Sequence, residues 1–243
     1  MRDYAEEVKN RVKFIKDTVA ASKAKGIVFA NSGGKDSALT GILCKMACDN
    51  TVSLILPCGV ASNYNLDRTD AMALSKQYNI PTRGIDLAET KNAFLRSVGT
   101  DIKITERAIA NISPRLRMMA VYAVATSENR IVAGTGNLSE YHLGYFTKWG
   151  DGGYDFNPIA DLTATEVLEF LKYLNAPESI VNKPPSAGLY EGQSDEIELG
   201  ITYERIDKYI TTGEAVPADK AIIDRYHEST HHKRRPPILY QGE

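Results

Sequence analysis

A polar segment at residues 32–37, with the sequence SGGKDS, combines residue types that can bind phosphate. It follows a short apolar run at 26–29, which predicts a buried strand, and precedes an apolar stretch at 38–46, which predicts a helix. Adjacent glycines let the backbone approach a ligand closely, and free N–H groups at a helix start attract anions. The carboxylate at position 36 would repel phosphate unless a cation lay between them, so the segment predicts a shared Mg²⁺ ion.

Two better-known phosphate-binding loops do not match this segment. A Walker A loop needs Lys followed directly by Ser or Thr, whereas Asp36 separates Lys35 from Ser37. The dinucleotide-binding pattern G-x-G-x-x-G is absent from this turn. The segment is similar instead to the S-G-G-x-D-S pyrophosphate loop of the N-type ATP pyrophosphatases. That resemblance implies cleavage of ATP between its α and β phosphates, with ATP contacts at Ser32, Gly33, Gly34, Lys35, Asp36 and Ser37.

Composition limits the other functions of the chain. A net charge of −2 over 243 residues argues against a nucleic-acid partner. Cys44, Cys48 and Cys58 are too few for a disulfide framework. The first two could share a metal ion, or could simply be buried small residues. The charged N-terminal segment does not resemble a signal peptide, and no apolar run approaches membrane length. We therefore expect a cytoplasmic protein with no membrane partner.

Strands and helices alternate along the first part of the chain. The pattern predicts an amphipathic helix at 3–24, a helix at 66–78, and strands at 51–57, 82–86 and 130–133. This alternation predicts an α/β fold: a single-domain doubly wound parallel sheet with flanking helices, of the adenine nucleotide alpha-hydrolase-like class. Ligands on such sheets bind beyond the carboxyl ends of the strands, where the polar segment lies.

The second half of the chain is more irregular. Ser113 and Pro114 predict the N-cap and first turn of a new helix. A glycine- and aromatic-rich stretch at 144–158 predicts a binding loop, and Thr163 with Glu166 predicts a capping box at the start of a helix at 163–175. The stretch at 183–195 is polar and irregular, which is typical of a lid.

Several further segments, in order over nearly the whole chain, resemble those of ammonia-dependent NAD⁺ synthetases. The most specific is GYFTKWGDGG at 144–153. The others are residues 32–37, Asn111 with 115–118, 134–137 with Glu140, 183–187, 195–196 with 199–201, and 232–234.

The resemblance implies a reaction in two steps. The nicotinate carboxylate of deamido-NAD⁺ attacks the α-phosphorus of ATP and releases pyrophosphate, and ammonia then displaces AMP to form the amide of NAD⁺. It implies Asp36 and Glu140 as Mg²⁺ ligands, Thr135 and Ser186 as further ATP contacts, and Asp36 with Lys148 as catalytic residues. It also implies contacts to deamido-NAD⁺ from Arg115, Lys148, Asp155, His232 and Lys233. No residue stands out as a base for ammonia.

Two positions differ from the family pattern. Ala164 stands where relatives usually have a lysine that reaches the ATP phosphates, and Gly188 stands where Asp is common. Lys35 could supply the missing charge or could point to solvent. These differences leave two alternatives open: another ATP pyrophosphatase that adenylates a different substrate, and a nucleotide-binding relative with impaired catalysis.

The resemblance also implies a nitrogen source and an assembly. Only residues 1–25 precede the first predicted strand, which is too short for a fused glutaminase, so we expect one synthetase domain over residues 1–243 that uses ammonia. Apolar residues on more than one face of the helical stretch at 100–127 predict burial against something besides its own sheet. The resemblance implies that the corresponding helices pair two copies, so we expect a homodimer.

Overall fold

The computed structural model describes residues 2–59, 64–183 and 195–242. At its centre is a parallel sheet with strand order β3-β2-β1-β4. The strands are β1 (Gly26–Ala30), β2 (Thr51–Ile55), β3 (Thr82–Gly84) and β4 (Arg130–Val132). β1 pairs with β2 on one side and β4 on the other, with Ile27 opposite both Thr51 and Ile131. The strand order changes direction between β1 and β4, so their carboxyl ends flank a topological switch point.

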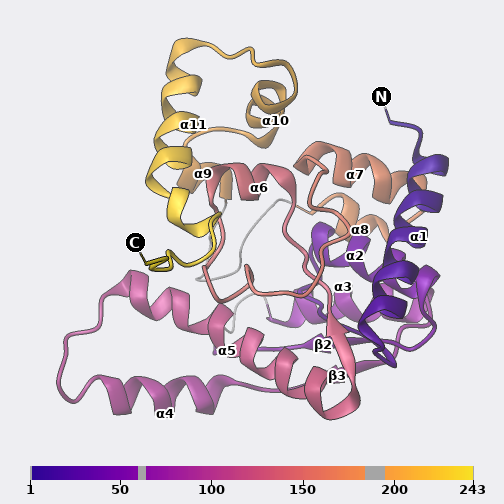
Figure 1. Cartoon of the computed structure of the whole chain (residues 1–243), viewed down its shortest axis with the longest axis horizontal. Helices are drawn as coiled ribbons and strands as arrows, with labels where there is room; N and C mark the ends of the chain where they lie inside the picture. The colour runs from indigo at the N-terminus through magenta and orange to yellow at the C-terminus, as the bar shows by residue number, and fades with distance from the viewer. Residues whose placement is uncertain (1, 60–63, 184–194, 243) are drawn as a thin grey trace.

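Apolar side chains of β1 alternate between two cores. Ile27 and Phe29 pack in one cluster with α1, α2 and α7, whereas Val28 packs in the other with α5. All three side chains are fully buried, so helices cover both faces of this strand. The doubly wound parallel sheet predicted from the sequence is therefore confirmed (Figure 1).

The helices account for most of the remaining described chain. They are α1 (Tyr4–Ser22), α2 (Lys35–Ala47), α3 (Tyr64–Gln77), α4 (Ala88–Val98), α5 (Glu106–Glu128), α6 (Leu138–Leu143), α7 (Ala164–Tyr173), α8 (Glu178–Val181), α9 (Asp195–Leu199), α10 (Tyr203–Thr212) and α11 (Pro217–Ser229), followed by a 3₁₀ turn at His231–Lys233. α1, α2, α3 and α7 match the helices predicted at 3–24, 38–46, 66–78 and 163–175. The sequence pattern did not predict α6, α8 and α9, which are too short to show a helical period.

The predicted helix start at Ser113 and Pro114 is wrong. α5 begins at Glu106, where Thr105 caps the first turn, and it continues through Pro114. Proline removes a helix N–H bond, and this interrupted turn lies against the 144–153 loop. A Cβ built on Gly150 would lie 2.9 Å from the Cβ of Pro114, and Thr147 donates to Asn111 Oδ1 at 2.6 Å. Tertiary packing on the proline turn thus outweighs its local preference.

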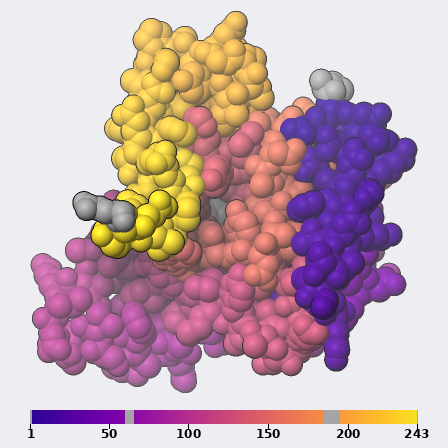
Figure 2. Space-filling view, in the orientation of Figure 1, coloured from indigo at the N-terminus to yellow at the C-terminus, as the bar shows by residue number. Residues whose placement is uncertain are grey.

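Two parts of the chain extend away from the sheet. α4 and the start of α5 reach sideways, and α10 and α11 form a lobe beside α6 (Figure 1). The surface is hollowed between the yellow C-terminal segment and the segments that follow β4 (Figure 2). Among the described residues, no helix combines the length and apolarity needed to cross a membrane.

Candidate active site

The loop between β1 and α2 is shaped by Gly33. Its φ of +72° lies in the left-handed region, and a Cβ at this position would lie 2.2 Å from the backbone oxygen of Asp67. Asn31 Oδ1 accepts the Gly33 N–H at 3.1 Å and fixes the turn. Gly34 is the N-cap of α2 and, having no side chain, makes no capping hydrogen bond to the first N–H groups of the helix. The first N–H groups of α2 therefore stay available to an anion.

The two serines of the loop bind the loop itself. Ser37 Oγ donates to the Gly34 carbonyl at 3.0 Å and accepts the Ser32 N–H at 3.3 Å. The two hydroxyl oxygens lie 3.1 Å apart. Ser37 is buried, whereas Ser32 is exposed and can turn toward a ligand.

Lys35 lies inside the site. Its residue surface is only 9% exposed, and its Nζ lies 2.5 Å from Asp36 Oδ2 and 5.6 Å from the ring centroid of Tyr203. Burial alone would lower the pKa of the Lys35 ammonium, but the charges of Asp36 and Glu140 raise it above its ordinary value. Of the two alternatives for Lys35, the solvent-facing one is therefore wrong.

A second turn meets this loop from the neighbouring strand. After β4 the chain passes through Thr135, which is half-buried, and starts α6 at a capping box of Asn137 and Glu140. Asn137 Nδ2 also donates to Asp36 Oδ1 at 2.9 Å, which joins the two turns. Burial raises the pKa of the Glu140 carboxyl well above its ordinary value, and the nearby charge of Asp36 adds to the rise. Asp36 and Glu140 thus converge at the switch point.

The metal-binding capacity of this pair follows from its chemistry. Two carboxylates without a larger protein cage suit Mg²⁺, which keeps several waters and shares phosphate oxygens. Among the described residues, no group of three or more His, Cys, Asp or Glu side chains could hold a metal by itself. Cys44 is fully buried in the core, as expected if the cysteines are structural.

A cavity of about 240 Å³ adjoins the turn between β4 and α6. Asn137 and Glu140 line one part of it, the 144–153 loop lines another, and the C-terminal segment lines a third. Phe146, Lys148, Trp149, Lys233, Arg234 and Arg235 are among its lining residues. The cavity therefore combines aromatic faces with several cations beside the carboxylate pair.

Two lysine side chains connect the segments that line this cavity. Lys148 Nζ donates to the His232 carbonyl at 2.6 Å. Lys233 Nζ donates to the carbonyls of Gly144 and Phe146 at 2.8 and 2.7 Å. Burial lowers the pKa of the Lys233 ammonium, and the charge of Arg107 adds to this effect. Each ammonium satisfies backbone acceptors while keeping its charge beside the cavity.

The other predicted substrate contacts lie farther from the carboxylate pair. Arg115 is exposed and donates to the Lys148 carbonyl from Nε and Nη2, each at 3.3 Å. Asp155 is exposed and accepts from the Tyr122 hydroxyl at 2.9 Å and the Val132 N–H at 2.7 Å. Asp155 thus ties β4 to α5 and is not among the residues that line the cavity. Ser186 and Gly188 lie outside the described residues.

Three contacts of the loop were not predicted. The amide of Asn137 binds Asp36, the ring of Tyr203 lies over Lys35, and Lys183 Nζ donates to the Gly33 carbonyl at 3.4 Å. Lys183 Nζ also pairs with Asp67 Oδ1 at 2.7 Å and with Asp70 Oδ2 at 2.9 Å. A capping-box pattern, Asn followed three residues later by Glu, could have located Asn137 at a helix start, but not its contact with Asp36. Each of the three contacts joins segments more than 100 residues apart along the chain, so no local sequence signal marks it.

Position 164 lies near the same region. Ala164 is buried in a cluster with Leu199, Ile201 and Tyr203, and its N–H donates to Ser139 Oγ at 3.0 Å. A longer side chain here would have to displace packed residues.

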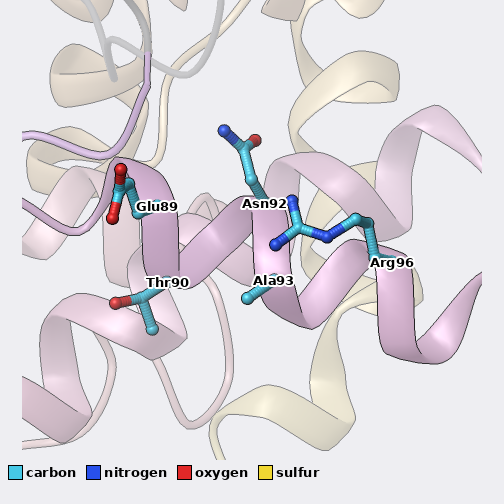
Figure 3. Close-up of a pocket in the computed structure, with 5 residues that line it drawn as sticks. All are labelled: Glu89, Thr90, Asn92, Ala93 and Arg96. Carbon is cyan, nitrogen blue, oxygen red and sulfur yellow. The ribbon is translucent and has the colours of Figure 1, made fainter.

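An open depression lies along α4 (Figure 3). Its lining residues, Glu89, Thr90, Asn92, Ala93 and Arg96, all belong to that helix. This depression is therefore separate from the phosphate-binding turns.

Comparisons with known proteins match this chain to NAD and NMN synthetases. The family model for NAD synthase matches residues 7–237. The NH3-dependent NAD⁺ synthetase of Carboxydothermus hydrogenoformans is 41% identical over 238 residues, which is 97% of each chain. The solved structure of NMN synthetase from Francisella tularensis has a TM-score of 0.94 and 36% identity, with both chains covered to 100%. The NH3-dependent NAD synthetase from Campylobacter jejuni has a TM-score of 0.83 and 28% identity, covering 99% of this chain and 100% of its own.

Proposed function

The chain belongs to the NAD synthase family, and we propose that its two turns and the adjoining cavity perform the two steps of that family's reaction. It is an ammonia-dependent ligase that uses ATP to amidate deamido-NAD⁺ and forms NAD⁺, AMP and pyrophosphate. The observation that carries the residue assignment is the contact between Asn137 and Asp36. It joins the phosphate-type loop to the turn that also lines the cavity, so two substrates can meet there.

In the first step a carboxylate oxygen of nicotinate attacks the α-phosphorus, and the bond to the pyrophosphate oxygen breaks. Negative charge then grows on the pyrophosphate, and fixed donors stabilise it most in the transition state. The N–H groups at the start of α2, the Ser32 hydroxyl and the Lys35 ammonium are the donors of this chain, and Ser37 contributes by holding the loop in place through the Gly34 carbonyl. Thr135, on the neighbouring turn, and Ser186 are assigned as further ATP contacts.

Asp36 and Glu140 are the residues that would hold Mg²⁺. When bound, the metal neutralises phosphate charge and orients the triphosphate. Asn137 donates to both carboxylates, from its N–H to Glu140 Oε2 at 3.0 Å and from Nδ2 to Asp36 Oδ1 at 2.9 Å, and this shared partner supports the assignment.

In the second step ammonia attacks the carbonyl carbon of the adenylate, loses a proton, and AMP leaves. The cavity beside Glu140 is assigned to the nicotinate substrate, with Lys148 and Lys233 facing its anionic groups. Arg115, Asp155 and His232 are assigned to its more distant parts. The aromatic wall at Phe146 and Trp149 limits the access of water, which would otherwise hydrolyse the adenylate.

A second candidate substrate is the mononucleotide form of the same nicotinate acid. The observation that favours it is the match to NMN synthetase from Francisella tularensis, which has a higher TM-score than the Campylobacter jejuni NAD synthetase. The chemistry at the carboxylate is identical, so only the contacts to the remainder of the substrate would differ.

One assay separates these functions. Purified protein is incubated with ATP, Mg²⁺, ammonium and either deamido-NAD⁺ or nicotinate mononucleotide, and AMP and the amide product are measured. We expect a higher kcat/KM with deamido-NAD⁺, because the curated relative that matches 97% of this chain is an NAD⁺ synthetase. A higher value with the mononucleotide would establish the second candidate, and no AMP with either would refute both.

We also propose that residues 1–243 are a single synthetase domain. We expect turnover with ammonium and none with glutamine alone, because the NAD synthase family model accounts for residues 7–237 and relatives that match nearly the whole chain are NH3-dependent enzymes. Glutamine-supported turnover by the pure protein would contradict this. The cytoplasmic location stays a prediction from the sequence.

We also propose a homodimer that buries the arm formed by α4 and the start of α5. α4 has no buried residue among its described side chains, and Phe94, Ile102 and Met119 are 46%, 59% and 56% exposed. Exposed apolar side chains of this size are typical of interaction surfaces. Light scattering at micromolar concentration should give twice the chain mass, and Phe94→Asp should shift it toward the monomer mass.

A further inference from the structure

Lys35 and Asp36 form an ion pair at the start of α2. Lys35 Nζ bonds Asp36 Oδ2 at 2.5 Å, and the second oxygen of Asp36 accepts Asn137 Nδ2 at 2.9 Å. The side chains of Lys35 and Asp36 are only 9% and 18% exposed. Both oxygens of the carboxylate are therefore engaged, one of them by a positive charge.

The groups around Lys35 keep its ammonium at a position that would also attract a metal ion. Asp36, Glu140 and Asp195 all act electrostatically on Lys35. The ring of Tyr203, which is 4% exposed, covers the ammonium at 5.6 Å. A desolvated charge stays in such a place because carboxylates and an aromatic face replace water around it.

A divalent ion and this ammonium compete for the same oxygen. Mg²⁺ requires oxygen ligands at about 2.1 Å, and an ammonium bonded to that oxygen repels it. The phosphates of ATP would offer the ammonium new acceptors, because Lys35 is the first residue of α2 and follows the glycines of the loop.

We propose that Lys35 excludes metal from Asp36 until ATP binds, and that its ammonium then moves from Asp36 to a phosphate oxygen. The order of binding is thereby fixed: ATP releases the carboxylate that its own metal ion needs. The inference rests on the proposed function only in taking ATP as the ligand of this loop.

Manganese binding tests the exclusion directly. Mn²⁺ bound to the protein without nucleotide is measured by electron paramagnetic resonance. Lys35→Met should bind Mn²⁺ at least about tenfold more tightly than the unchanged protein, because the competing charge has gone. Lys35→Arg, which keeps a positive charge, should stay near the original affinity.

Two further variants show where the metal binds. Lys45→Met is the matched control, because Lys45 lies on the same helix and pairs with Asp49 at 3.4 Å; it should leave Mn²⁺ affinity unchanged. Adding Asp36→Asn to Lys35→Met should remove the gain. If Lys35→Met does not fold, as judged by circular dichroism, Lys35→Gln provides the same test with a smaller expected gain.

Equal Mn²⁺ affinity of Lys35→Met and the unchanged protein would overturn the exclusion, as would a gain that survives Asp36→Asn. The movement to phosphate has its own test: at saturating Mg²⁺, Lys35→Met should weaken ATP binding about tenfold. Unchanged ATP affinity would overturn the proposed movement of the Lys35 ammonium to a phosphate oxygen. These measurements contain neither nicotinate substrate nor ammonia, so failure of the amidation assay would refute the proposed function and leave this inference standing.

Discussion

The two halves of the candidate site are built in different ways. The phosphate-type loop lies at strand ends, and its groups bind one another across short distances: Ser37 to Gly34, Asn31 to Gly33 and Asn137 to Asp36. The cavity is instead closed by long side chains, with Lys148 and Lys233 reaching backbone carbonyls of separate segments.

This difference has a consequence for function. A loop fixed by the sheet is preorganised, so its donors need little rearrangement when charge develops on a phosphate. Lysine side chains are flexible, so the segments that they connect can separate when a larger substrate enters and can then come together again. We expect changes to the loop to act on turnover and ATP binding, and changes to the cavity to act on the KM of the nicotinate substrate.

The largest effect should come from Asp36→Asn. An amide is a weaker ligand for a hard cation and cannot balance the charge of Lys35. We expect turnover to fall at least about a hundredfold, similar to the loss of one strong transition-state donor. ATP–pyrophosphate exchange with the nicotinate substrate measures the step directly.

A matched control tests whether loss of any paired aspartate would have the same effect. Asp161 pairs with a buried cation, as Asp36 does, but its partner is Arg11 at 2.6 Å and it lies outside the two turns. Asp161→Asn should lower thermal stability while leaving turnover at 25 °C near its original value. If Asp36→Asn keeps more than half of the activity, Asp36 is not a metal ligand.

Gly33→Ala should have the next largest effect. The added Cβ would meet the Asp67 carbonyl at 2.2 Å, and the φ of +72° is itself unfavourable for Ala. We expect a loss of more than about 2 kcal/mol in the free energy of unfolding, since strain and overpacking add. ATP affinity should also fall, because the loop must move to relieve the clash.

Gly213→Ala separates the two causes. Gly213 has a similar φ of +75°, but its Cβ would meet no atom within 4 Å. This variant should lose only about 1 kcal/mol and should bind ATP normally. Denaturant unfolding and ATP titration of both variants check the pair; equal losses would show that the Asp67 contact is unimportant.

The cavity should respond differently, as Lys233→Met can show. The variant loses two hydrogen bonds and one positive charge at the wall. We expect the KM of the nicotinate substrate to rise about tenfold, with the KM of ATP nearly unchanged. Lys220→Met is the control. Lys220 Nζ lies 5.5 Å from the ring centroid of Tyr209, just as Lys233 Nζ lies 5.5 Å from that of Phe146, but Lys220 is outside the cavity.

Lys233 should also make the KM of the nicotinate substrate depend on pH. Burial lowers the pKa of Lys233, so its ammonium is lost at a lower pH than that of an ordinary lysine. As the pH rises through that value, an anionic substrate loses an attractive charge and its KM increases. Steady-state kinetics from pH 7 to 10 should show this rise in the unchanged protein and a smaller one in Lys233→Met.

The sequence predicted the loop better than the cavity for physical reasons. Strand, glycine turn and helix start are local features, so residues 26–47 carry the whole geometry of the loop. The walls of the cavity come from α6, the 144–153 loop and the C-terminal segment, and only packing brings them together. Without the family resemblance, Lys233 would have been assigned to a solvated run of charges.

Pro114 and Lys35 show the same limit at single positions. Local preference places a helix start at Pro114, yet packing of Gly150 on that turn keeps it inside α5. The direction of Lys35 depends on Tyr203, more than 160 residues away along the chain. Neither outcome could be predicted from a window of neighbouring residues.

The smallest expected effect concerns α6, which serves both halves of the site. Its first turn holds Asn137 and Glu140, and its end leads into the 144–153 loop. Near that end the rings of His142 and His227 have centroids 4.4 Å apart, and His227 Nδ1 bonds the His142 carbonyl at 2.8 Å.

Burial lowers the pKa of His142 below its ordinary value of 6.5, and the charges of His227 and Arg234 act in the same direction, partly opposed by Asp224. Below pH 6.5 the unfolded chain therefore binds a proton that the folded protein refuses. The stability linked to His142 is fully present above pH 6.5 and is lost as the pH falls through the lower folded pKa. His142→Gln removes this titration, so the fall in Tm between pH 7.5 and pH 5.5 should be smaller in the variant, by about 1 to 2 °C for a half-exposed group. A comparison at pH 8, where the histidine is neutral, isolates the change in packing. If both proteins lose the same number of degrees on acidification, His142 does not couple α6 to pH.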